Sequence, residues 1–161
     1  MKKCPKCSAE LNSNEIFCPK CGANTDENVF NDAINNVSEK FEQFNNTIDT
    51  TYEYSGEDIS KNRGFAILAY FGLLFLIPLL AAPNSPYARY HTNQGILLFI
   101  VSTVSSVTAA ILNIIGFGIL SNILNVTSGT ITLVFMIIGI INASQGRAKE
   151  LPIIGSIRIL K

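Results

Sequence analysis

The sequence predicts an all-α membrane domain of three transmembrane helices, preceded by a small cysteine-containing head and an amphipathic connector helix. Residues 64–143 carry one charged side chain, Arg89, which is typical of segments buried in lipid. Apolar residues recur at helical spacing between positions 30 and 48. All four cysteines lie within the first 21 residues. We therefore divide the chain into a head (1–24), a connector (25–62) and a membrane domain (63–161).

The head carries the sharpest local motif. Its cysteines follow the spacing C-x2-C-x10-C-x2-C, in which each Cys-Pro-Lys-Cys turn brings two thiolates together. Four thiolates suit tetrahedral zinc with no open coordination position, and a head of this size cannot bury enough core to fold unaided. We therefore expect structural Zn²⁺, bound by Cys4, Cys7, Cys18 and Cys21. The head resembles the zinc-ribbon family over residues 4–22, but Ser8 stands where a glycine commonly follows the first pair, and we expect it to loosen that knuckle.

Other interpretations of the head are two disulfides or a redox-active pair. The doubled C-x2-C spacing and the lack of a signal-peptide pattern near Met1 disfavour disulfides, and no strand–helix–strand pattern surrounds a redox pair. Nucleic acid is not an expected partner, because the head offers four lysines, no arginine and one aromatic side chain beside an acidic connector.

The connector is predicted to form a helix over about residues 27–47. Its other face is polar, and residues 25–60 hold nine acids against Lys40 alone. Anionic lipid repels such a face, so we expect the apolar stripe to cover a partner helix from another copy or another protein. A partly disordered tether is the alternative. The stripe, with alternating spacings of four and three, is Phe30, Ile34, Val37, Phe41, Phe44 and Ile48.

Three uncharged segments are predicted to cross the bilayer, at 65–82, 96–115 and 123–141. At about 1.5 Å per residue, each covers roughly 27–30 Å of helix. A Gly-Phe-Gly turn at 116–118 separates the last two. A soluble helical core is the alternative, but it would leave almost no polar face for water. The tail at 147–161 is too short to cross and is expected to lie at the interface.

The loop after the first segment is unusually polar. Ser85 is expected to cap a helix that Pro86 opens. Tyrosine and arginine side chains there suit the lipid–water boundary. The only histidine has no Cys, Asp or Glu at ligand spacing, which favours a hydrogen-bonded interfacial role over metal binding or base catalysis. The residues expected on the first turns of the second span are Arg89, Tyr90, His91, Asn93 and Gln94.

Two stretches give the membrane domain a family resemblance. They are Ala-Arg-Tyr-His-x-Asn-Gln (88–94) and Lys-Glu-Leu-Pro-Ile-Ile-Gly (149–155). Over about residues 62–160 the domain is similar to the Tic20-like family of small bacterial and plastid membrane proteins. The resemblance implies a helical multi-pass membrane protein, and plastid members act in protein import. Those members are usually described with four spans and lack a zinc head, which departs from this sequence.

The indicators of topology conflict. Three spans put the head and the tail on opposite sides, and a thiolate head favours the reducing cytoplasm. Positive charge indicates the other orientation. Lys61 and Arg63 flank the first span on the head side, whereas the opposite side carries Arg89 in the first loop and four cations in the tail. We expect a multi-pass protein of the cell membrane with a cytoplasmic head. A hairpin or re-entrant first segment would let both ends face the cytoplasm.

The sequence therefore predicts a non-enzymatic integral membrane protein whose zinc-bound head mediates protein interaction or sensing at the membrane surface. An enzyme is not expected, because the sequence has no Ser/His/Asp set, no phosphate-binding glycine loop and no catalytic carboxylate pair. The alternative, implied by the Tic20-like resemblance, is a component of a translocation or channel system. The expected partners are the lipid bilayer and a protein, or a second copy, bound through the connector helix.

Overall fold

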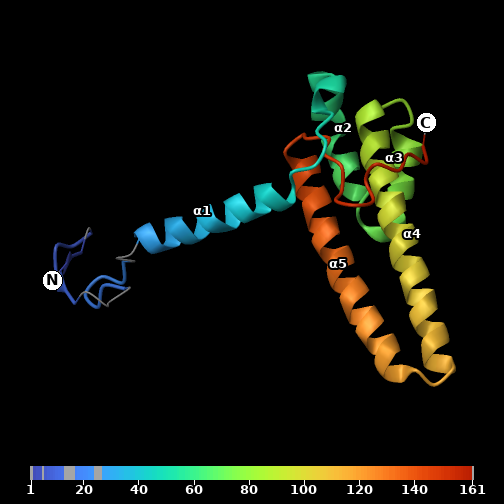
Figure 1. The fold of residues 1–161 in the computed structure, drawn as a ribbon. Helices are drawn as coiled ribbons and strands as arrows, with labels where there is room; N and C mark the ends of the chain where they lie inside the picture. Colours follow the sequence, from blue (N-terminus) through green and yellow to red (C-terminus); the bar gives the residue numbers. More distant parts are fainter. Residues whose placement is uncertain (1, 5, 13–16, 24–26, 161) are drawn as a thin grey trace. The chain divides into compact units, whose positions relative to one another are not determined.

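The computed structural model describes residues 2–4, 6–12, 17–23 and 27–160, and the chain divides into two compact units at residues 44 and 45 (Figure 1). The described residues are predominantly helical, as predicted. In chain order the elements are β1 (Lys2–Lys3), β2 (Glu10–Leu11), α1 (Glu27–Phe44), the 3₁₀ turn η1 (Thr51–Glu53), α2 (Gly56–Leu68), the 3₁₀ turn η2 (Gly72–Phe75), α3 (Leu76–Ala81), α4 (Pro86–Ile114) and α5 (Gly118–Ser144).

The first unit begins with a minimal antiparallel hairpin. Lys2 of β1 pairs with Leu11 of β2, and Lys3 pairs with Glu10. The buried cluster beneath the hairpin consists of Cys4, Leu11 and Cys18. Two of these three residues are cysteines, so apolar burial alone supplies little stability to the head.

Helix α1 ends at Phe44, three residues earlier than predicted. The reason lies in the next residue: Asn45 is fully buried and its side chain is hydrogen-bonded to Asn142 of α5. Ile48 therefore lies beyond the helix, in an extended segment where Asp49 forms a β-bridge with Lys149. The side chain of Phe30 lies outside the described residues.

Helices α4 and α5 form the long antiparallel pair of the second unit (Figure 1). Their 29 and 27 residues make them long and apolar enough to cross a membrane. Only 22% and 17% of their most apolar windows are buried, whereas a soluble core helix would be mostly buried. The turn between them falls at 115–117, where Gly116 has φ +94°, close to the predicted turn. Large apolar side chains such as Val104, Ile119 and Val126 face outward, as lipid-facing residues do.

The first predicted span, 65–82, is wrong as a transmembrane helix. Two helices of the described residues pass the length and hydropathy criteria for a span, and this segment is divided among the end of α2, η2 and α3. Two residues explain the break. Gly72 has φ +54°, outside the helical region, and Pro78 lacks the N–H that a continuous helix would need. A hydropathy window registers neither feature.

The other elements of the second unit gather at one end of the α4–α5 pair. Helix α2 packs against α4 and α5, and α3 packs against α4. Gly95 of α4 allows the close approach, since a Cβ there would overlap the carbonyl oxygen of Ala69. The C-terminal tail returns to the same end, where Leu151 is buried. We refer to this assembly of α2, α3, the first turns of α4, the last turn of α5 and the tail as the polar end.

Candidate functional site

The polar end is built on the first turns of α4. As predicted, Pro86 opens this helix and Ser85 caps it, its hydroxyl accepting a hydrogen bond from the amide of Ala88 at 3.0 Å. Apart from Arg89, which is exposed, the side chains that follow as far as Gly95 point inward rather than to solvent. Tyr87, His91 and Gln94 are buried completely. The turns expected to lie at the lipid–water boundary therefore form the polar interior of this unit.

Asn93 and Gln94 bind the tail. The Asn93 amide donates to the carbonyl oxygen of Ile157 at 2.7 Å, and its oxygen accepts from the amides of Ile159 and Leu160 at 2.6 and 3.0 Å. Gln94 donates to the carbonyl oxygen of Gly155 at 2.9 Å and accepts from the amide of Leu151 at 3.3 Å. Residues 88–94 and 149–155, which carry the family resemblance, are thus joined by the hydrogen bonds of Gln94. The tail, predicted to lie at the interface, is docked on α4.

His91 of α4 lies in a network that links three parts of the chain. Its Nδ1 lies 2.9 Å from the hydroxyl of Tyr70, and its ring packs 4.8 Å from that of Tyr87. The Tyr87 hydroxyl donates to the carbonyl oxygen of Ala143 at 3.1 Å. Gly139 of α5 leaves room for the Tyr70 ring, which a Cβ at that position would overlap. This network ties the chain after α2 to both long helices, and His91 is a buried structural residue in it.

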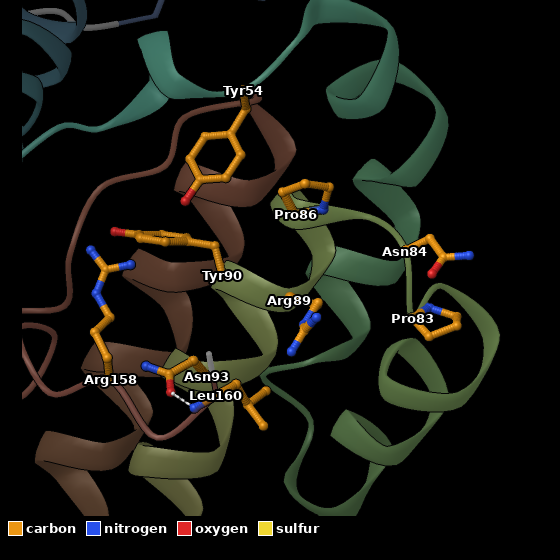
Figure 2. A pocket seen from close by; sticks show the side chains of 9 residues that line it. All are labelled: Tyr54, Pro83, Asn84, Pro86, Arg89, Tyr90, Asn93, Arg158 and Leu160. Carbon is orange, nitrogen blue, oxygen red and sulfur yellow. Dashed lines mark hydrogen bonds between the residues drawn. The ribbon is translucent and has the colours of Figure 1, made fainter.

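Arg89 and Tyr90 line a cleft of about 430 Å³ at the surface of the polar end (Figure 2). Arg158 of the tail lies across the cleft, with its guanidinium carbon 5.1 Å from the centre of the Tyr90 ring. Its Nη2 is 3.3 Å from Glu150 Oε1. Arg89 itself is exposed. The residues that line the cleft are Tyr54, Pro83, Asn84, Pro86, Arg89, Tyr90, Asn93, Arg158 and Leu160.

Asp58 is an important residue of the polar end that sequence reasoning missed. Its carboxylate accepts hydrogen bonds from the Ser85 hydroxyl at 2.6 Å and from the Tyr87 amide at 3.0 Å, so it joins α2 to the start of α4. It also accepts from the Asn62 side chain at 2.7 Å. In the sequence Asp58 is one of nine acids in a polar stretch, with no signal to distinguish it.

The metal centre consists of two knuckles of the same geometry. In the first, the amide of Cys4 donates to the carbonyl oxygen of Ala9 and the amide of Ser8 donates to Cys4, both at 2.9 Å. In the second, Cys18 donates to Ala23 and Gly22 donates to Cys18, both at 2.8 Å. Ser8 has φ +58° and Gly22 has φ +68°. The serine therefore adopts the left-handed conformation of the glycine, and the first knuckle is not loosened.

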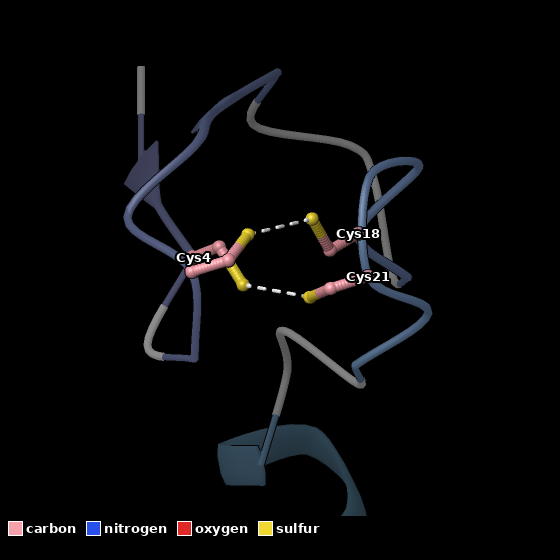
Figure 3. Close-up of side chains that lie close together, drawn as sticks. Cys4, Cys18 and Cys21 are labelled. Atoms are coloured by element: carbon pink, nitrogen blue, oxygen red, sulfur yellow. Dashed lines mark hydrogen bonds between the residues drawn. The ribbon is translucent and has the colours of Figure 1, made fainter.

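The four sulfur atoms fit one tetrahedral ion. All lie within 4.8 Å of one another, and the pairs Cys4–Cys21 and Cys7–Cys18 are 3.6 Å apart (Figure 3). A Zn–S length of about 2.3 Å requires sulfur atoms about 3.8 Å apart in a tetrahedron. These distances exclude disulfides, whose sulfur atoms are about 2 Å apart. The predicted structural zinc site is confirmed, with its ligands coming two from each knuckle.

The surroundings of the metal centre shift the pKa values of two thiols, those of Cys4 and Cys21, in opposite directions. Burial raises the pKa of Cys4, but the backbone amides of Cys7 and Lys6 and the neighbouring thiols outweigh it, and the pKa falls to about 6. The amide of Ala23 lowers the pKa of Cys21, but the thiols of Cys7, Cys18 and Cys4, together with burial, raise it to about 12. Metal binding requires the thiolate form of each ligand, so zinc binding at this centre releases protons.

The apolar stripe of the connector is open to solvent in its described part. Ile34, Val37 and Phe44 are 48%, 68% and 53% exposed, and Phe41 is half-buried. The residues between them on the polar face are also exposed. Helix α1 therefore carries an amphipathic surface of at least three turns whose apolar side has large exposed side chains.

Two family models match the chain. One is described as the magnetosome magnetite crystal formation protein family and matches residues 61–160, more than half of the chain. The other is described as a zinc-ribbon domain and matches residues 3–25, which confirms the resemblance of the head. No curated protein and no solved structure matches the chain. The comparisons do not show the Tic20-like resemblance.

Proposed function

We propose a function from the premise that this chain belongs to the magnetosome magnetite crystal formation protein family. The protein is a non-enzymatic membrane protein that is anchored by α4 and α5. Its zinc-bound head binds another protein at the membrane surface. The observation that carries the proposal is the pairing of a closed four-cysteine centre with an exposed apolar stripe on the helix that follows it. A closed centre offers no position for a substrate, so its role is to fold the head.

The proposal includes a topology of two spans, in which the two indicators of orientation agree. An even number of crossings returns both ends of the chain to one side, and the only connection on the other side, residues 115–117, is uncharged. Lys61, Arg63 and Arg89 then lie on the same side as the cations of the tail. The positive-inside rule and the reducing environment that thiolates need both favour the cytoplasm for that side. We therefore place the head and the tail in the cytoplasm at the cell membrane.

The charge of α1 favours protein over lipid as the ligand of its stripe. Helix α1 carries four acids, Glu27, Asp32, Glu39 and Glu42, against Lys40. Helices that lie on anionic membranes are rich in Lys and Arg on the polar face. An apolar stripe of helical period fits a groove or a second helix, and a second copy of this chain offers such a helix.

The family description names magnetite crystal formation, and we do not extend that role to the membrane part of this chain. From residue 64 onward Glu150 is the only acid, and it is paired with Arg158. Carboxylate oxygens are preferred ligands of hard cations, so this part of the chain has little with which to hold a mineral surface. Translocation was implied by the Tic20-like resemblance alone, which the comparisons do not show.

A photocrosslinker at position 37 tests the proposal in cells, with the same group at position 39, on the polar face, as the matched control. We expect a product from 37 and none from 39, with a mass that identifies a second copy or another protein. The Cys18→Ser substitution removes a zinc ligand. It should abolish those crosslinked products that require a folded head. Protease accessibility of tags at both termini checks the topology. Equal crosslinking from 37 and 39, or termini on opposite sides, would contradict the proposal.

A further inference from the structure

We propose that residues 71–80, where the chain reverses between α2 and α4, are embedded in the acyl chains of the leaflet beside the polar end without crossing the bilayer. The segment contains η2 and α3, whose four and six residues are half of the roughly 20 that a crossing helix needs. This inference rests on the proposed anchor, because it requires that α4 and α5 cross the membrane. It is independent of the zinc head and of its partner.

The segment has no face for water. Residues 71–80 include no polar side chain, and Leu73 and Leu80 are 61% and 78% exposed. A surface that binds a protein has an apolar centre within a polar rim, and this segment offers no such rim. Acyl chains can contact all of its exposed side chains, so the composition favours lipid over a protein partner. The large exposed side chains are Phe71, Leu73, Leu74, Leu76, Ile77 and Leu80.

The segment continues the apolar surface of the α4–α5 pair. On α5, large exposed apolar side chains occur over residues 119–137, which cover about 27 Å. On α4 they run from Ile100 to Ile114, about 21 Å, which is shorter than the roughly 30 Å of a hydrocarbon core. Directly before Ile100, the Phe99 ring lies 5.6 Å from that of Phe75, where η2 and α3 pack against α4. The exposed side chains of the segment therefore extend the apolar surface where that of α4 stops.

The reversal begins and ends at one polar rim. Lys61 and Asn62 of α2 line the same surface cleft, of about 400 Å³, as Asn84 and Ser85 before α4. Helix α2 packs against α3, and both lie beside α4 (Figure 1). Gly72, with φ +54°, lies in the turn between them. The chain therefore enters and leaves the segment on one side of the membrane, as an embedded reversal requires.

Backbone hydrogen bonds continue through the turn. The amide of Phe71 donates to the carbonyl oxygen of Leu68 at 3.2 Å, and the amide of Leu74 donates to that of Phe71 at 3.0 Å. At the end of α3, the amide of Ala82 donates to the carbonyl oxygen of Pro78 at 3.0 Å. Hydrocarbon supplies no water to unpaired amides, so a turn embedded in it must bond its backbone internally. These bonds meet that requirement at both ends of the segment.

The test uses the fact that the sequence contains no tryptophan. Leu74→Trp and Leu80→Trp each introduce a single fluorophore into the segment, at exposed positions where the larger ring needs no internal space. Ile131→Trp, exposed on α5, is the control for lipid contact, and Tyr52→Trp, exposed on η1, is the control for water contact. The full-length zinc-loaded proteins are reconstituted into phosphatidylcholine vesicles with or without bromine on the acyl chains, and iodide is equilibrated across the membrane as the aqueous quencher.

We expect brominated chains to quench Leu74→Trp and Leu80→Trp at least half as strongly as Ile131→Trp, and iodide to quench both several-fold less than Tyr52→Trp. Iodide quenching equal to that of Tyr52→Trp would overturn the inference, and the anchor would stand if brominated chains still quench Ile131→Trp. Protection of both positions from both quenchers would overturn the lipid assignment in favour of a second copy that covers the segment. If brominated chains do not quench Ile131→Trp, the proposed anchor fails and this inference fails with it.

Discussion

The side-chain amides of Asn45 and Asn142 exchange two hydrogen bonds, of 2.8 and 3.0 Å, across 97 positions of the sequence. Both side chains are fully buried. The pair fixes the segment after α1 to the last turn of α5, and Lys149 adds a hydrogen bond to the carbonyl oxygen of Asn45 at 3.2 Å. A buried amide pair of this kind defines one position for the segment, because any shift leaves donors and acceptors unpaired.

Substituting either asparagine should therefore destabilise the second unit. Asn142→Ala leaves the Asn45 amide buried without its partner, and we expect a loss of about 1–3 kcal/mol in the free energy of unfolding. Asn45→Ala combined with Asn142→Ala should cost less than the sum of the single changes. Unfolding in mixed micelles gives the free energies, and Asn125→Ala, exposed on the same helix, serves as the control. Additive losses would show that the two amides do not interact in solution.

The left-handed backbone conformation in both knuckles predicts that two small substitutions change the stability of the zinc-bound head in opposite directions. Gly22 has φ +68° with no atom within 4 Å of a Cβ built there, so Gly22→Ala meets backbone strain alone. We expect the zinc-bound head to lose roughly 1 kcal/mol. Ser8→Gly relieves the same strain at φ +58° and should stabilise the head by a similar amount. Competition with a chelator measures both, and the prediction fails if the two substitutions shift zinc release in the same direction.

Helix α5 contains two glycines that should respond differently to alanine. At Gly139 the added methyl group would overlap the Tyr70 ring, whereas at Gly129 it would meet nothing within 4 Å. We expect Gly139→Ala to cost about 1–3 kcal/mol through displacement of Tyr70 from His91, and Gly129→Ala to be neutral or slightly stabilising. Thermal unfolding in detergent compares the two. Equal melting temperatures would mean that α5 and Tyr70 are not in close contact.

The lowered pKa of Asp49 predicts a small loss of folding stability in acid. Burial raises its pKa, but hydrogen bonds from the Thr51 hydroxyl and amide, with the charges of Lys149 and Arg147, outweigh burial and lower it. Because the folded pKa is below the unfolded value of about 3.9, its contribution is present above about pH 4 and is lost as the pH falls through the folded pKa. Asp49→Asn keeps the acceptor for Thr51 and removes the charge. The variant should be less stable by under about 1 kcal/mol at pH 7 and equal to the original protein at lower pH, as measured by thermal unfolding across the pH range.

The parts of the fold that could be predicted depend on neighbours in the sequence. The zinc ligands are set by two turns of four residues, and the start of α4 by Ser85 and Pro86, so local chemistry was sufficient for both. The first predicted span failed because average hydropathy outweighed Gly72 and Pro78, the residues that break the helix. The polar end could not be predicted, since its hydrogen bonds join residues such as Gln94 and Gly155 that lie 61 positions apart.

The same long-range contacts give the last prediction, which concerns the tail. Gln94 is fully buried and holds both the carbonyl oxygen of Gly155 and the amide of Leu151. Gln94→Ala leaves those two backbone groups without partners, and we expect the tail to detach with a free-energy change of about 1–3 kcal/mol. Limited proteolysis should then cleave within the tail roughly tenfold faster or more, because cleavage follows the population of the open form. Gln145→Ala, just past the end of α5, provides a control with the same change of residue type. Unchanged proteolysis of Gln94→Ala would show that Asn93 and Leu151 are sufficient to hold the tail.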